Sequence, residues 1–208
     1  MKSGNAEYAG IVASIVFWPA LISFAAIRPE YSHATKAISE LGVIGAPNAI
    51  LFNIVGFMIP GILLSICGGV LAYSIDKRRS ALWWLLVVSG LGFAATSFPA
   101  EMDGGSFDMD SVFTQTHLVM TIVSAVPWII AMYAIPSRIS KNYQWRSFKF
   151  SAIVLAIFCT FAFATNVFSD LLLPSAALGQ RVAFGGYFAW FFVMSLMHLS
   201  VENKSKAT

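Results

Sequence analysis

Six long apolar stretches, separated by short polar connectors, limit what this chain can fold into more than any other feature. A bilayer core of about 30 Å requires roughly 20 mostly apolar residues per helix, and the stretches cover residues 8–27, 50–73, 81–99, 115–136, 148–173 and 181–200. The chain is 58% hydrophobic and 11% charged, a composition that would expose far too much apolar surface in water. The sequence predicts an all-α, polytopic membrane bundle of six transmembrane helices, with residues 1–208 forming one domain.

The charged residues of the connectors are sorted between two sides. Only Arg28, Lys36 and Arg181 lie on one side, which leaves ten of the 13 Lys and Arg residues on the other. Seven of the ten acids join the side that is poor in Lys and Arg: Glu30, Glu40, Glu101, Asp103, Asp108, Asp110 and Asp170. Lys and Arg accumulate on the cytoplasmic side of membrane proteins, so we expect both termini in the cytoplasm. The net charge of +3 then follows from orientation, and we expect membrane lipids as partners and no nucleic acid.

Small residues recur at helical spacing in two of the spans. The second span offers Gly61, Ser65 and Gly69, and the third offers Ser89 and Gly92. Helices in a bilayer associate through close packing of such residues. The pattern predicts helix–helix seams and leaves the oligomeric state open.

The first outer connector contains a segment with helical features. Ser32 is placed to cap a short amphipathic helix, and Gly42 is placed to end it. At 100° per residue, apolar side chains form one stripe while His33, Lys36 and Glu40 form another. We expect this helix to lie along the membrane surface, where it either covers the bundle or contributes polar groups to a site.

The fourth span carries a polar stripe. Thr114, His117, Thr121 and Ser124 follow an i, i+3, i+7, i+10 pattern, which places them on one helical face. An ionisable side chain that faces lipid is costly. His117 is therefore expected to face the bundle interior or a water-filled cavity.

Further polar residues are expected at the same outer level. Asn53 lies in the second span, Asn166 and Asp170 lie one turn apart in the fifth, and Arg181 begins the sixth. Arg181 is close enough in sequence to pair with Asp170 across a short loop. The pair either locks two helices together or contributes to a ligand site.

Acidic residues gather in the connector before the fourth span. Its spacing does not match a calcium-binding loop, which needs acids at fixed alternating positions. Asp108 and Asp110, with His117, are the weak candidates for binding a metal, and a solvated acidic loop is the alternative. The identity of any cofactor is left open.

Several motifs together resemble a known membrane family. They are Ser32-His33, Ile38-Ser39-Glu40-Leu41-Gly42, Phe98-Pro99 followed by acids, and His117 at the start of the fourth span. The layout resembles the prokaryotic six-span family called domain of unknown function 998. The Ile-Ser-x-x-Gly pattern is also similar to the eukaryotic Frag and damage-regulated autophagy modulator proteins. The resemblance implies that Ser39, Glu40, Gly42 and His117 are motif positions in a multi-pass protein of a prokaryotic inner membrane, and it implies no established reaction.

Two function classes follow from these patterns. The first is a membrane protein that holds a lipid or small amphiphile in an outward-facing polar pocket formed by His33, Glu40, Asn53, His117, Asn166, Asp170 and Arg181. The second is an intramembrane hydrolase acting on a lipid or acylated substrate. In it, His117 would be a general base or metal ligand, Ser39 the nucleophile, and Glu40 or Asp108 an orienting carboxylate or metal ligand. The chain has no HExxH or GxSxG motif. A transporter or a channel is disfavoured, because the halves do not repeat and no ring of charge lies at mid-depth.

Overall fold

The computed structural model describes residues 5–207, apart from the side chains of Asp170, Lys206 and Ala207. Its α-helices are α1 (Ala9–Ala26), α2 (Ala49–Phe52), α3 (Ile59–Asp76), α4 (Ala81–Ala95), α5 (Val112–Ile139), α6 (Lys149–Val167), α7 (Ser169–Leu172) and α8 (Ala176–Ala207). Short 3-10 segments are η1 (Asn5–Tyr8), η2 (Ile38–Gly42) and η4 (Arg146–Phe148), and η3 (Asn53–Met58) is a π-helical segment. Strands β1 (Met102–Asp103) and β2 (Ser106–Phe107) form an antiparallel hairpin. The predicted all-α fold is confirmed.

Five of the predicted spans correspond to helices that are long and apolar enough to cross a membrane. They are Asn5–Ala26, Ala49–Asp76, Val112–Ile139, Arg146–Val167 and Ala176–Ser205. The remaining one, α4, is apolar but shorter. The chain is therefore a multi-pass membrane protein, with α4 packed between α3 and α5.

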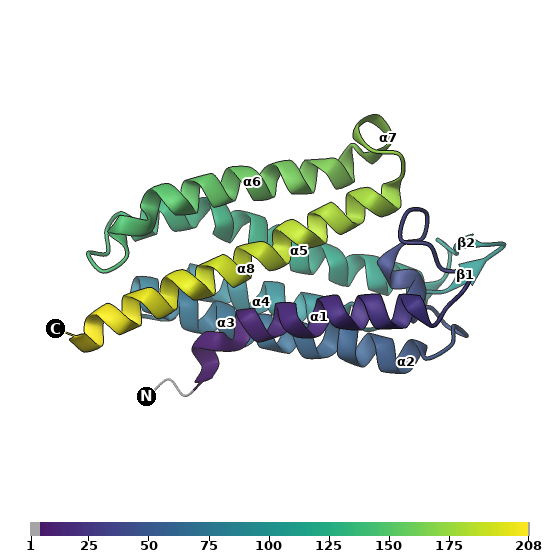
Figure 1. The fold of residues 1–208 in the computed structure, drawn as a ribbon, viewed down its shortest axis with the longest axis horizontal. Helices are drawn as coiled ribbons and strands as arrows, with labels where there is room; N and C mark the ends of the chain where they lie inside the picture. The colour runs from purple at the N-terminus through teal and green to yellow at the C-terminus, as the bar shows by residue number, and fades with distance from the viewer. Residues whose placement is uncertain (1–4, 208) are drawn as a thin grey trace.

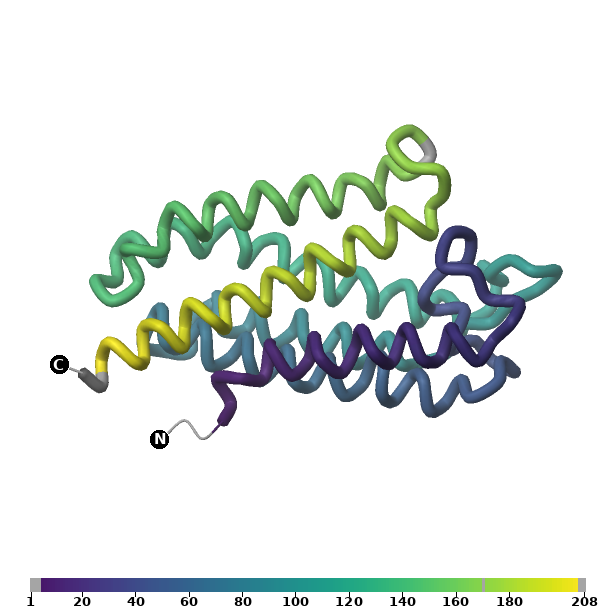
Figure 2. Tube along the Cα trace, in the orientation of Figure 1, coloured from purple at the N-terminus to yellow at the C-terminus, as the bar shows by residue number. Residues whose placement is uncertain are grey.

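The helices form an elongated bundle, and α8 runs along most of its length (Figures 1 and 2). One end carries the start of α1 and the end of α8. The opposite end carries α7, the β1–β2 hairpin and the first loop, which we define as residues 27–48 (Figure 1). We call this the first-loop end. It holds the polar residues that the sequence singled out at the outer level.

The second span contains a local change of helix type. Between α2 and α3, the π-helical η3 begins at Asn53, and Pro60 follows it as the second residue of α3. Proline lacks a backbone N–H, and its ring meets the carbonyl group four residues earlier. The wider π turns accommodate this clash within a continuous helix, and such segments are frequent at functional sites.

The predicted seams are formed by glycines at backbone contacts. A Cβ atom at Gly61 would overlap the backbone of Ala94, and one at Gly90 would overlap the backbone of Ser65. The Ser65 hydroxyl also donates a 3.1 Å hydrogen bond to the Val87 carbonyl. These contacts hold α3 and α4 close together.

Several helix boundaries differ from those predicted, and two of them affect the first-loop end. The fifth span ends at Val167 rather than continuing to residue 173, because the backbone leaves the helical region at Phe168. The sixth span begins at Ala176 rather than at Arg181, because Ser175 caps it by accepting a hydrogen bond from the Leu178 N–H. The earlier start places Arg181 in the second turn of α8.

The predicted helix over Ser32–Gly42 is shorter than expected. The Ser32 hydroxyl accepts from the Ala34 N–H and forms a local turn, after which Ala37 is extended (φ −65°, ψ 152°). Only η2 is helical, and it ends at Gly42 as predicted. Its apolar residues Ile38 and Leu41 are 0% and 1% exposed, so η2 inserts into the bundle instead of lying on the membrane surface.

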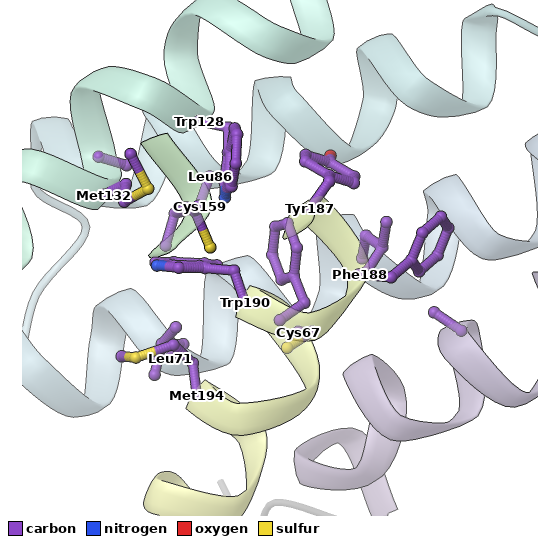
Figure 3. Packing of buried hydrophobic residues seen from close by; sticks show 14 of the residues in the cluster. Cys67, Leu71, Leu86, Trp128, Met132, Cys159, Tyr187, Phe188, Trp190 and Met194 are labelled. Carbon is purple, nitrogen blue, oxygen red and sulfur yellow. The ribbon is translucent and has the colours of Figure 1, made fainter. Parts of the chain in front are cut away.

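An aromatic core joins the helices below the first loop (Figure 3). Phe93 stacks on Tyr187 with ring centroids 5.5 Å apart, and Trp128 meets Tyr187 edge-on at 5.0 Å. Cys67 and Cys159 are buried and unpaired within this core. The core supports the cavity described next.

Candidate functional site

A cavity of about 270 Å³ lies in the half of the bundle nearer the first-loop end, among η2, η3, α4, α5, α6 and α8. Its polar lining residues are Ser39, Thr96, His117, Thr121, Ser124, Asn166 and Gln180. Its apolar and aromatic lining residues are Phe57, Phe93, Leu118, Ala125, Trp128, Phe163, Ala183, Phe184 and Tyr187. A mostly apolar pocket with a few convergent polar groups is typical of a small-molecule site.

Helix α5 supplies one face of this cavity. His117, Thr121 and Ser124 of the predicted stripe all line it, and Trp128 continues the same face by one turn. Thr114 does not line the cavity, because its hydroxyl is tied to the backbone of Glu101. The indole Nε1 of Trp128 is buried and has no hydrogen-bond partner among the described residues.

The orientation of His117 is fixed by a backbone group. Its Nδ1 lies 3.0 Å from the carbonyl oxygen of Phe98. A carbonyl oxygen only accepts hydrogen bonds, so Nδ1 carries the hydrogen and the neutral ring offers Nε2 as its acceptor. His117 can therefore accept a hydrogen bond or a proton from a ligand.

Three hydroxyl groups meet at the inner side of the cavity. The Tyr187 hydroxyl lies 2.9 Å from the Ser89 hydroxyl and accepts a 3.3 Å hydrogen bond from Ser124. All three residues are buried. This network satisfies the polar tip of Tyr187 inside the membrane-spanning region and fixes the ring that lines the cavity.

The first loop covers the cavity at the first-loop end, and two hydrogen bonds of η2 help to hold it there. The Ile38 N–H donates to Gln180 Oε1 at 2.7 Å. The Asn53 side-chain amide donates to the Gly42 carbonyl at 2.8 Å, and it occupies the space that a Cβ at residue 42 would need. Asn53 is thus buried as predicted near the site, but it positions the loop and does not line the cavity.

Arg181 is turned away from the cavity. Its guanidinium donates to the Tyr31 hydroxyl at 2.5 Å, to His33 Nδ1 at 3.4 Å and to the Ala177 carbonyl at 2.8 Å. Burial raises the pKa of Tyr31 to about 12. Partial burial and the nearby positive charge of Arg181 lower the pKa of His33. His33 and Arg181 therefore hold the first loop to α8.

Glu40 stabilises its own loop. Its carboxylate accepts a 2.8 Å hydrogen bond from the Ala37 N–H and forms a 3.2 Å ion pair with Lys36. Its backbone carbonyl accepts a hydrogen bond from Arg28. Glu40 does not line the cavity, whereas its neighbour Ser39 does.

Asn166 and Asp170 are the two residues of the predicted fifth span that the sequence predicts to contribute to the site. Asn166 lines the cavity. Asp170 lies in α7, but its side chain is outside the part that the structure describes, so its pairing with Arg181 stays a prediction.

The acidic connector forms the β1–β2 hairpin. Gly104 and Gly105 both have positive φ (56° and 87°), as a tight two-residue hairpin turn requires. Asp108 accepts a hydrogen bond from the Asp110 N–H within this loop. Among the described residues, no group of three His, Cys, Asp or Glu side chains is arranged to hold a metal ion.

The sequence of this bundle matches one family over nearly its whole length. Residues 11–197 match the family described as protein of unknown function (DUF998). The chain belongs to this family. No curated protein and no solved structure matches the chain. The matched DUF998 region includes every residue that lines the cavity.

Sequence reasoning missed several cavity residues of this DUF998 member. Trp128 and Tyr187 resemble ordinary apolar span residues, although Trp128 continues the stripe of His117 at helical spacing. Gln180 precedes the more conspicuous Arg181, and only the earlier start of α8 turns Gln180 toward the cavity. Extending the stripe of His117 by one helical turn predicts Trp128. Nothing in the sequence indicates whether Gln180 or Arg181 faces the cavity.

Proposed function

We propose that this protein binds a lipid or small amphiphile in the cavity between α5, α6 and α8. The observation that carries the proposal is that polar groups and apolar side chains occupy different parts of one cavity. Hydrogen-bonding groups of Ser39, His117 and Gln180 gather under the first loop, while aromatic and aliphatic side chains form the walls. This arrangement suits a molecule with a polar head and an apolar body.

The apolar part of the ligand would leave the cavity beside α5. Leu118 and Thr121 line the cavity and are also exposed on the surface of the bundle. The neighbouring α5 side chains Val119, Ile122 and Val126 are apolar and 48–59% exposed, as expected for a surface that faces hydrocarbon. The opening therefore suits entry from within the membrane.

The cavity volume limits how much of the ligand is enclosed. Ligand pockets usually measure roughly 300–1,000 Å³, and this cavity of about 270 Å³ lies just below that range. It suits a head group with the first part of one chain. The rest of the chain would extend past Leu118 into the bilayer.

We further infer that α4 is a sixth span and that both termini are cytoplasmic, in the inner membrane of a prokaryote. At 1.5 Å per residue, the 15 residues of α4 extend about 22 Å, and the hydrogen-bonded turns through Phe98 lengthen this path. The excess of Lys and Arg at the end where α1 begins supports the orientation. Accessibility labelling of single cysteines at Lys77 and Gly105 tests it, because only the latter is expected to react from outside the cell.

Lipid retention tests the binding proposal. Ala183 is buried against the cavity, so Ala183→Phe should fill it and reduce the amount of lipid that copurifies in mild detergent, measured by native mass spectrometry. Leu196→Phe adds a similar ring on an exposed part of α8 and should leave retention unchanged. Asn166→Ala with His117→Ala removes polar groups without filling space. Unchanged retention in both cavity variants would rule the proposal out.

A second candidate function is hydrolysis of a lipid or acylated substrate, since Ser39 and His117 line the same cavity. The Ser39 hydroxyl would attack the acyl carbon and release the alcohol, with its proton passing through His117 Nε2, and water would then cleave the acyl-serine ester. Glu40 would take no part in orienting the base, because its carboxylate is bonded to Ala37 and Lys36. Labelling by an alkyl fluorophosphonate that Ser39→Ala abolishes would favour this function; equal labelling of both proteins would exclude it.

A further inference from the structure

The described cavity lining contains no charged side chain of Asp, Glu, Lys or Arg. Glu40 and Arg181, which directly follow the lining residues Ser39 and Gln180 in the chain, are engaged elsewhere. Arg181 donates to Tyr31 and His33, and the Glu40 carboxylate is held by Ala37 and Lys36. An ionised head group placed in this lining would lose its hydration without gaining a counter-charge, which is costly.

The lining also offers a defined hydrogen-bond donor and a defined acceptor to a ligand. Gln180 Oε1 accepts the Ile38 N–H, which fixes the amide so that its NH2 group is the part left to meet a ligand. His117 donates from Nδ1 to Phe98, which leaves Nε2 as an acceptor. The cavity therefore combines a donor from Gln180 with an acceptor from His117.

We propose that the cavity selects an amphiphile whose head group is uncharged and carries a hydroxyl. This inference rests on the proposed lipid-binding function and names the class of ligand. A hydroxyl accepts a hydrogen bond from the Gln180 amide and donates one to His117 Nε2 at the same time. A carboxylate or a fully ionised phosphate offers acceptors only, so it would place negative oxygen against the His117 acceptor. A simple ester likewise has nothing to donate.

Three probes with the same dibrominated acyl chain separate these alternatives. They are a monoacylglycerol, the free fatty acid at a pH where it is ionised, and its methyl ester. Bromine atoms quench tryptophan fluorescence at short range, and Trp128 lines the cavity; Trp128→Phe assigns the quenching to this residue. We expect saturable quenching by the monoacylglycerol at concentrations lower by about tenfold or more than for either other probe.

Two variants test the residue assignments. His117→Phe keeps an aromatic ring but removes the acceptor, so the monoacylglycerol should bind no better than the methyl ester. Leu196→Phe adds a ring on an exposed part of α8 outside the cavity, so it should preserve the preference. Equal or tighter binding of the fatty acid or the methyl ester by the wild-type protein would overturn this inference while leaving lipid binding intact. Absence of quenching by all three probes would overturn lipid binding itself.

Discussion

Ile38 and Gln180 are 142 positions apart, and the Ile38 N–H donates a 2.7 Å hydrogen bond to the Gln180 side chain. Ile38 is fully buried, which makes the loss of this acceptor costly. The bond joins the first loop to α8 directly above the cavity. It couples the position of Ser39, the next residue in the chain, to a helix that lines the same cavity.

Loss of this acceptor should loosen the first loop. Gln180→Leu leaves the Ile38 N–H without a partner, and a buried unsatisfied donor costs about 1–3 kcal/mol. We expect hydrogen exchange at the Ile38 amide to accelerate strongly. Gln180→Glu retains an acceptor oxygen and serves as the control. Equal exchange rates in the wild type and Gln180→Leu would show that the loop is held by other contacts.

The α3–α4 seam should not tolerate a methyl group. A Cβ at residue 90 would overlap the Ser65 backbone, and backbone atoms cannot move aside without shifting a helix. We expect Gly90→Ala to destabilise the protein by about 1–3 kcal/mol in denaturation experiments in detergent. Gly185→Ala is the matched control, because a Cβ at residue 185 meets nothing within 4 Å. A loss as large for Gly185→Ala as for Gly90→Ala would contradict this account.

The contacts of His33 should weaken in acid. Partial burial and the positive charge of Arg181 lower the pKa of His33 below its ordinary value of 6.5, so folding favours the neutral ring. This contribution is fully present above pH 6.5 and is lost as the pH falls through 6.5 toward the lowered pKa. Hydrogen exchange in residues 31–37 should therefore increase in that range. His33→Asn should remove this pH dependence; an unchanged profile in the variant would assign it to another group.

An ion pair at the opposite end should stabilise the bundle measurably. Arg138 Nη1 lies 2.6 Å from Asp76 Oδ2, which also accepts from the Ser80 hydroxyl. The Asp76 side chain is only 10% exposed, so solvent screens the pair weakly. A double-mutant cycle with Asp76→Ala and Arg138→Ala should give a coupling energy of about 1 kcal/mol. The more exposed Arg28–Glu30 pair should give less. A larger coupling there would contradict the role assigned to burial.

Several properties could be predicted because they depend on local physics. Hydropathy and length identified the spans, because a helix within lipid must form all its backbone hydrogen bonds internally and must present apolar side chains. Helical periodicity placed His117, Thr121 and Ser124 on one face, and that face lines the cavity. The spacing of small residues indicated the contacts of Gly61 and Ser65. Each of these inferences uses residues within one helix.

Local sequence patterns indicate which segments enter the membrane and which face of α5 is polar, but the packing of the helices selects the polar residues that share the cavity. The start of α8 turns Gln180 inward and Arg181 toward Tyr31. The insertion of η2 brings Ser39 to the cavity but leaves Glu40 outside it. In both cases adjacent residues point in different directions, and the direction is set by a cap and by a hydrogen bond between segments 142 residues apart. No local pattern encodes such a contact, because it exists only after the helices have packed.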